Sequence, residues 1–273
     1  MRELLIVGAG IVGSSAKRIA DEMGWKTTLV DANPKKAASR AALATIRPQW
    51  LGENGKQIAE RSWRWYEKWG ATVTRTAIVS SYSSSESRRQ QDWWLVDPDK
   101  VLIQPDVVAE IDGIWNDHSG QYANVNGDKC RYDAILIGVG AHDPRYLPPF
   151  KEQHGATLIN ETMRLAEPLY VHHLRPYHSL TIGCMNDVVR LGSSVANTEQ
   201  KAIDEIYRML EVAEQRGIVP KVSDWILTTN IRAKAPTIKE PRRGERTTTI
   251  GNLGRSGYGY APHLVATWLA DLT

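Results

Sequence analysis

Residues 4–13 read LLIVGAGIVG, and this stretch decides the fold. Leu4–Val7 is a short run of apolar residues that stops at a glycine, which is typical of a strand buried on both faces of a parallel sheet. A helix is predicted over Gly13–Met23, because its apolar residues recur at helical spacing and Gly24 follows it. The next run, Lys26–Asp31, predicts a second strand. The chain therefore opens with a strand–helix–strand unit.

The same stretch contains the glycine pattern GxGxxG between the first strand and the first helix. In this pattern Gly8 makes the tight turn, and Gly10 lets a pyrophosphate approach the positive end of the helix. Gly13 allows the helix to pack closely on the sheet. Asp31, at the end of the second strand, can accept hydrogen bonds from an adenosine ribose, and its charge would repel a 2′-phosphate. The sequence thus predicts a site for a dinucleotide other than NADP.

Further along the chain, the pattern indicates a second layer of structure. Thr72–Leu95 and residues 157–195 are rich in strand-like runs and predict an antiparallel sheet. Thr198–Arg216 predicts an amphipathic helix, and we expect the final helix to start at Pro262, a favoured first-turn residue. The predicted fold class is α/β, with a Rossmann-type domain and a small, mainly antiparallel β domain.

We expect both domains to be discontinuous in sequence. The dinucleotide-binding domain is predicted to comprise residues 1–47, 100–145 and 226–273. The second domain, which would hold the substrate, is predicted to comprise residues 48–99 and 146–225.

The composition limits the classes of protein to which this chain can belong. Among its 273 residues, Lys and Arg number 34 against 31 Asp and Glu, so the net charge of +3 permits an anionic partner without requiring one. The two cysteines form no CxxC pair, and no histidine spacing typical of a metal site occurs, so no metal is expected. No apolar run reaches the roughly 18 residues that a membrane span needs. These features favour a soluble, cytoplasmic protein, in the host cytoplasm if the protein is viral.

Four separated segments resemble the FAD-dependent amine and amino-acid oxidases of the D-amino-acid oxidase and glycine oxidase type. The first is GAGIVGSS at residues 8–15, with the strand end VDAN at residues 30–33. The second is Ala38–Ala44, although Ala44 stands where the family usually has glycine. The third and fourth are Tyr132–Ala141 and Ile250–Pro262.

The resemblance implies that the cofactor is FAD, bound without a covalent link. It also implies that the amino end of the last helix lies beside the flavin, where N–H groups and the helix dipole favour negative charge on the reduced ring. The residues expected to contact the cofactor are Gly8, Gly10, Ile11, Val12, Gly13, Asp31, Ala32, Ser39, Arg40, Ala42, Ala44, Thr45, Val107, Gly140, Gly254, Arg255, Ser256, Gly257 and Tyr258.

For the substrate, the segment NIRAKAPT at residues 230–237 resembles the family's strand that carries a carboxylate-binding arginine. The resemblance implies that Arg232 pairs with the substrate carboxylate, for which a guanidinium fork offers two parallel, charge-assisted hydrogen bonds. It also places Arg255 near the substrate and Tyr258 on the wall of the same cavity. Arg232, Arg255 and Tyr258 are therefore the expected catalytic residues.

The reaction that the resemblance implies is oxidation of the C–N bond of an amino acid or N-substituted glycine. A hydride passes from the substrate Cα to flavin N5, the imine hydrolyses, and dioxygen reoxidises the flavin. The protein supplies orientation, a desolvated pocket and the carboxylate clamp.

Two alternatives stay open, because this chain resembles an unusually short member of the family. A short substrate domain could leave the flavin open to a glycine adduct on a thymine base of phage DNA. The basic segment at residues 239–246, Arg88 and Arg89 would then contact phosphates. The second alternative is a flavin-binding subunit of a hetero-oligomer without its own activity. A small substrate, DNA and an oligomer of this chain are the partners considered, and no membrane is expected.

Overall fold

The structure is a computed structural model that describes residues 1–81, 84–140, 145, 150–175, 178–234, 241–251 and 253–273. A four-stranded parallel sheet in the order β15-β9-β1-β2 lies at the centre of one part of the molecule. Its strands are β1 (Glu3–Val7), β2 (Lys26–Val30), β9 (Ala134–Ile137) and β15 (Thr247–Thr249). The predicted strand–helix–strand opening is therefore confirmed.

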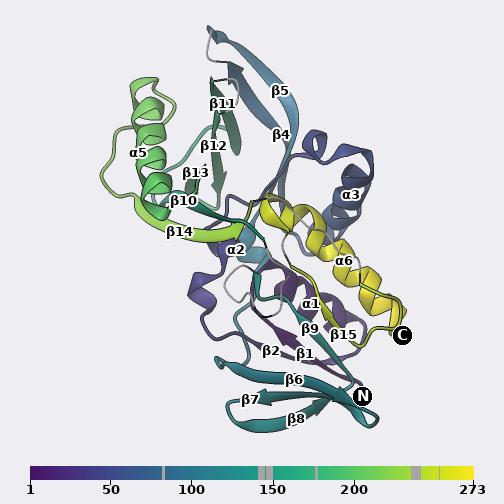
Figure 1. Cartoon of the computed structure of the whole chain (residues 1–273). Helices are drawn as coiled ribbons and strands as arrows, with labels where there is room; N and C mark the ends of the chain where they lie inside the picture. The colour runs from purple at the N-terminus through teal and green to yellow at the C-terminus, as the bar shows by residue number, and fades with distance from the viewer. Residues whose placement is uncertain (82–83, 141–144, 146–149, 176–177, 235–240, 252) are drawn as a thin grey trace.

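Both faces of this parallel sheet are covered, as the continuous apolar run in β1 predicts. Leu4 and Ile6 point into a core shared with helices α1 (Ile11–Glu22), α3 (Gly52–Lys68) and α6 (Gly257–Asp271). Leu5 and Val7 point the other way, into a core shared with a three-stranded antiparallel sheet. That sheet contains β6 (Ile111–Asp117), β7 (Gly120–Val125) and β8 (Asp128–Tyr132), and it lies across the parallel sheet from α1 and α6 (Figure 1).

An eight-stranded sheet in the order β14-β10-β13-β12-β11-β4-β5-β3 forms the other part of the molecule. All of its pairs are antiparallel except β11 with β4, so the mainly antiparallel character predicted for this part is confirmed. Its strands are β3 (Thr45–Ile46), β4 (Thr72–Ser81), β5 (Ser84–Val96), β10 (Glu152–Asn160), β11 (Leu169–Arg175), β12 (His178–Met185), β13 (Val188–Ala196) and β14 (Ile226–Ala233).

Helix α5 (Glu199–Gln215) covers one face of the large sheet and packs on β10 and β13 (Figure 1). Its N-cap is Thr198, whose hydroxyl accepts a hydrogen bond from the N–H of Lys201. The helix predicted over Thr198–Arg216 is thus confirmed. The short elements that complete the fold are η1 (Pro34–Lys36), α2 (Ala38–Ala41), η2 (Pro48–Trp50), α4 (Pro98–Val101) and η5 (Gly254–Ser256).

The final helix corrects one prediction, because α6 begins at Gly257 and Pro262 lies inside it. A proline inside a helix lacks the N–H that would bond to the carbonyl four residues earlier, here that of Tyr258. The hydroxyl of Tyr66 on α3 donates to this carbonyl at 2.8 Å instead. Because the missing hydrogen bond is replaced from a neighbouring helix, the extra turn Gly257–Ala261 stays helical.

Two further observations concern the part of the chain that the structure describes. None of its helices has the length and apolar character needed to cross a membrane. Nor do its His, Cys, Asp and Glu side chains gather in any group of three or more that could hold a metal ion.

The close approach of α1 to β1 predicts a strong response to one added methyl group. A Cβ at Gly13 would lie 1.8 Å from the backbone oxygen of Gly8, which cannot move without displacing the turn. We expect Gly13→Ala to destabilise the fold by about 3 kcal/mol, which would lower the melting temperature by about 6–12 °C. Circular dichroism during heating measures this shift.

The matched control is Gly113→Ala on β6, where the new Cβ would meet only the Trp115 ring at 3.7 Å. We expect its melting temperature to match that of the wild type or to rise slightly. Equal melting temperatures for the Gly13 variant and the wild type would contradict the packing described here.

Candidate cofactor and substrate site

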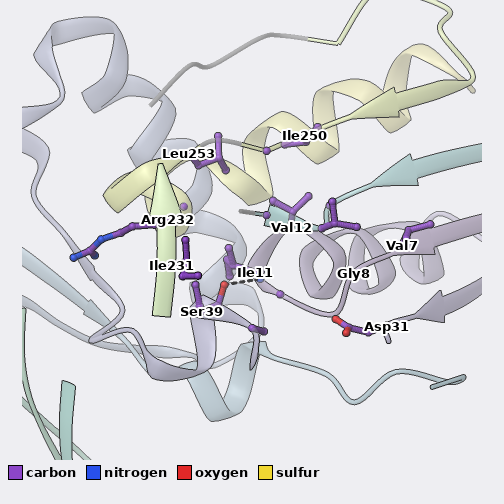
Figure 2. Close-up of a pocket in the computed structure, with 18 of the residues that line it drawn as sticks. Val7, Gly8, Ile11, Val12, Asp31, Ser39, Ile231, Arg232, Ile250 and Leu253 are labelled. Carbon is purple, nitrogen blue, oxygen red and sulfur yellow. Dashed lines mark hydrogen bonds between the residues drawn. The ribbon is translucent and has the colours of Figure 1, made fainter. Parts of the chain in front are cut away.

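A cavity of about 720 Å³ lies at the carboxyl ends of the parallel strands, the edge at which α/β sheets bind ligands. Its walls come from six separate segments of sequence, and Figure 2 shows how several of their residues face one another. The lining residues are Val7, Gly8, Gly10, Ile11, Val12, Asp31, Ala32, Asn33, Ala37, Ala38, Ser39, Ala42, Ala109, Glu110, Ile111, Gly138, Val139, Gly140, Arg145, Asn230, Ile231, Arg232, Ala233, Ile250, Gly251, Leu253, Gly254, Gly257 and Tyr258.

The glycine turn between β1 and α1 forms one end of the cavity. Gly8 has φ of 98°, a conformation that disfavours other residues, and its N–H donates to the carbonyl of Val30 at 2.7 Å. A Cβ on Gly8 would lie 2.7 Å from the carbonyl oxygen of Gly138 on the next strand. At Gly8 the turn is therefore held between two strands by backbone atoms.

The first turn of α1 is open toward the cavity. Its N-cap is Gly10, which has no side chain to bond the free N–H groups of the helix. Ser39 of α2 accepts a hydrogen bond from the N–H of Ile11 at 3.0 Å, and its hydroxyl is drawn beside that residue in Figure 2. The remaining N–H groups of the turn and the helix dipole suit a pyrophosphate.

Asp31 lies at the end of β2, beside the glycine turn (Figure 2). Its Oδ2 accepts a hydrogen bond from the N–H of Ala9 at 2.6 Å, and its Oδ1 accepts one from the N–H of Asn33 at 2.8 Å. These bonds fix the carboxylate, and each oxygen keeps a lone pair that can accept a ribose hydroxyl. The geometry therefore fits the role predicted for this residue.

The predicted cofactor residues divide into three groups. Those that line the cavity are Gly8, Gly10, Ile11, Val12, Asp31, Ala32, Ser39, Ala42, Gly140, Gly254, Gly257 and Tyr258. The side chain of Arg255 lies outside the described part of the structure, although its backbone lies in η5. The remaining predicted residues, which are absent from the cavity lining, are Gly13, Arg40, Ala44, Thr45, Val107 and Ser256.

Several residues of this last group have other contacts. Arg40 Nη2 donates to the carbonyl of Ile103 at 2.9 Å, and Val107 forms a parallel bridge with Val30. Beyond Val107, the next residues along the chain that reach the cavity are 109–111. Ala44 has φ of 56°, a left-handed conformation that costs a residue with a Cβ about 1–2 kcal/mol and explains why glycine suits this position.

Tyr258 is a structural part of the cavity wall. Its hydroxyl donates to the carbonyl of Ser39 at 3.0 Å, and its own carbonyl accepts the hydroxyl of Tyr66. Burial raises the pKa of both tyrosine hydroxyls, so both stay protonated at neutral pH. Tyr258 thereby ties the start of α6 to the segment that carries Ser39.

Arg232, on β14, reaches the cavity from the large sheet. In Figure 2 its guanidinium points away from Gly8 and Asp31, so the two ends of the cavity carry opposite charges. Arg232 Nη2 donates to the carbonyl of Ser194 at 3.5 Å, and the same nitrogen lies 3.1 Å from the point where a Cβ of Gly155 would be. A cation is therefore present at the end of the cavity farthest from Asp31.

Arg190 on β13 is a residue that the sequence analysis missed. Only 6% of it is exposed, and its Nη1 donates to the carbonyls of Arg40 at 2.7 Å and Ala42 at 3.4 Å. It thereby fixes the cavity-lining segment around α2 to the large sheet. In sequence it is one polar residue in the strand-like run VVRLG, so only the fold shows what it contacts.

We expect Arg190→Met to destabilise the fold by about 2–4 kcal/mol, because two buried carbonyls would lose their charged donor. The dinucleotide should also bind more weakly, because the segment that carries Ser39 and Ala42 would lose its hydrogen bonds to β13. Urea unfolding and a fluorescence titration with the dinucleotide measure the two effects.

Asp99→Asn is the control, because Asp99 is 3.6 Å from Arg190 Nη2 but its side chain is 68% exposed. We expect this change to cost less than about 1 kcal/mol. If the two variants have equal stability, Arg190 does not act through the carbonyls of the α2 segment.

Comparison with known proteins finds a family model that matches the first third of the chain. Residues 3–95 match the model of the DAO family, described as FAD dependent oxidoreductases. No curated protein sequence matches the chain.

Solved structures share the fold along the whole chain. Glycine oxidase from Bacillus cereus ATCC 14579 is 14% identical with a TM-score of 0.74, over 98% of this chain and 94% of that one. Glycine oxidase from Geobacillus kaustophilus is 13% identical with a TM-score of 0.71, over 100% of this chain and 95% of that one. L-Proline dehydrogenase from P. horikoshii is 12% identical with a TM-score of 0.71, over 100% of this chain and 93% of that one.

The fit of the cavity to a dinucleotide agrees with these matches. The backbone-only glycine turn, the open helix end and the fixed Asp31 carboxylate provide sites for a pyrophosphate and a ribose. Residues 3–95 therefore match the DAO family of FAD-dependent oxidoreductases, the whole chain shares the fold of the glycine oxidase structures, and the cavity fits FAD as the cofactor.

Proposed function

We propose that this enzyme oxidises the carbon–nitrogen bond of an amino acid or an N-substituted glycine and that dioxygen reoxidises the cofactor. The observation that carries the proposal is the position of Arg232, whose side chain belongs to the same cavity as the glycine turn. A guanidinium is suited to holding a carboxylate by charge-assisted hydrogen bonds. A carboxylated substrate can thus be held at the end of the cavity opposite Asp31.

The names of similar structures support this substrate class. Besides the glycine oxidases and L-proline dehydrogenase, they include iminodiacetate oxidase from Chelativorans sp. BNC1 and L-amino acid deaminase from Proteus vulgaris. Glycine, proline and iminodiacetate all carry a carboxylate close to an amine nitrogen. The identities of 10–15% tie this chain to the fold of these proteins, and the substrate class comes to it as part of the proposal.

FAD, when bound, would supply a two-electron acceptor for the hydride that leaves the substrate carbon. The residues of the chain bind and orient the substrate. Arg232 holds the carboxylate and so fixes the position of the neighbouring carbon, while Tyr258 stays protonated and keeps the wall in place. Arg255 remains a predicted second contact to the substrate.

The proposal is tested by mixing the purified flavoprotein with candidate substrates under anaerobic conditions and following the flavin absorbance band. We expect glycine, sarcosine or a D-amino acid to bleach the band, and oxygen to restore it. Bleaching only by an oligonucleotide that carries glycine-modified thymine would contradict the proposal and favour the DNA alternative. No bleaching by any amine would favour a flavin-binding subunit without activity.

Replacement of Arg232 tests the role of the carboxylate clamp. We expect Arg232→Met to raise the substrate concentration for half-maximal reduction about 100-fold, because hydrogen bonds worth about 3 kcal/mol to the carboxylate are lost. Stopped-flow absorbance measures the dependence on substrate concentration.

Arg164→Met is the matched control, since Arg164 forms an exposed ion pair with Asp187 at 2.7 Å and does not line the cavity. The control should behave as the wild type does. An unchanged concentration dependence in the Arg232 variant would show that the carboxylate is held elsewhere.

A further inference from the structure

Asn230 on β14 is a buried polar residue in the wall of the cavity. It is 8% exposed and belongs to the cavity lining. Among the residues that the structure describes, none forms a hydrogen bond with its side chain. Asn160 on β10 differs, because at 1% exposure its Oδ1 accepts from Thr162 N and its Nδ2 donates to the carbonyl of Asp224.

The amide of Asn230 lies beside the guanidinium of Arg232. The two residues are two positions apart on one strand, so their side chains share a face of the sheet. On the neighbouring strand Gly155 pairs with Asn230. A Cβ on Gly155 would lie 2.9 Å from Asn230 Oδ1, 3.2 Å from Asn230 Nδ2 and 3.1 Å from Arg232 Nη2. Because residue 155 has no side chain, both polar groups can lie over the same point.

Energetics favour a ligand as the missing partner. A largely buried amide with no partner in the protein has only the cavity solvent to bond with, and native proteins rarely keep one without a reason. A bound molecule in the cavity can supply the partner. Since Arg232 is a cation, the molecule that lies against both groups carries negative charge at that end.

We propose that Asn230 is a substrate-binding residue that forms one carboxylate site together with Arg232. This inference rests on the proposed function and adds a residue to it. A carboxylate has about four lone-pair positions, of which a guanidinium fork uses two, so Nδ2 of Asn230 donates to a third. Because the amide is neutral, it adds a hydrogen bond without adding a second charge to be balanced.

The test is a binding titration that needs no turnover. Acetate serves as a carboxylate that cannot be oxidised, acetamide serves as its neutral analogue, and the shift of the flavin absorbance band reports binding to the holoenzyme. We expect Asn230→Leu to weaken acetate binding about 10- to 100-fold, as the loss of one hydrogen bond to a charged group implies. Asn230→Asp should weaken binding of acetate more than that of acetamide, because it places a like charge beside the carboxylate.

Thermal unfolding separates a binding residue from a structural one. Asn230→Leu removes an amide that has no partner in the protein, so the melting temperature should equal or exceed that of the wild type. In the control Asn160→Leu, which removes an amide whose oxygen and nitrogen both have partners, the melting temperature should fall. Unchanged acetate affinity in Asn230→Leu overturns the inference, and so does weaker binding accompanied by a lower melting temperature.

The outcome also separates this inference from the proposed function. If an amino acid reduces the wild-type flavin and Arg232→Met abolishes acetate binding while Asn230→Leu does not change it, only the role of Asn230 is wrong. If neither amino acids nor acetate change the wild-type flavin spectrum, the proposed function itself fails.

Discussion

The close contact between the start of helix α1 and strand β1 is the constraint on which the rest of the site depends. At Gly13 there is no room for a Cβ, because the backbone oxygen of Gly8 occupies that space. Gly8 in turn lies against the carbonyl of Gly138 on β9. These contacts bring the open end of α1 to the edge of the sheet, so a pyrophosphate can bind to backbone N–H groups.

The second requirement is that the large sheet stays fixed against the dinucleotide-binding part. Arg190 ties the large sheet to the short segment around α2 by donating to the carbonyls of Arg40 and Ala42. Tyr258 ties the start of α6 to the same segment by donating to the carbonyl of Ser39. That segment therefore forms a wall shared by the Asp31 end and the Arg232 end of the cavity.

The cavity combines two kinds of surface. At the Asp31 end it offers backbone N–H groups and one fixed carboxylate, which suit a pyrophosphate and a ribose. At the Arg232 end it offers a guanidinium and the amide of Asn230 over Gly155. Under the proposed function, the Arg232 end holds the substrate carboxylate, so the flavin ring of the dinucleotide lies toward that end.

Local sequence patterns were sufficient to predict the parts of the site that depend on local structure. The glycine turn and the Asp31 strand end are formed by neighbouring residues, so local patterns predict them, whereas the strand that carries Arg232 was expected from its resemblance to the family. The start of α6 was misplaced at Pro262, because the hydrogen bond that supports the earlier turn comes from Tyr66 on another helix.

The residues that sequence reasoning missed depend on contacts between distant segments. Arg190 and Asn230 are single polar residues in strand-like runs, and what each one faces follows from sheet register and the path of the α2 segment. A local sequence pattern predicts neither the register of the sheet nor the path of the α2 segment. The wall at residues 109–111 was missed for the same reason, since only the three-dimensional arrangement brings it to the cavity.

A crystal structure of the purified yellow protein tests the central claim most directly. The account predicts one FAD in the cavity, with the adenosine ribose within hydrogen-bond distance of Asp31 and the isoalloxazine ring at the end that carries Arg232. A flavin bound in the opposite direction, or bound outside this cavity, would contradict it.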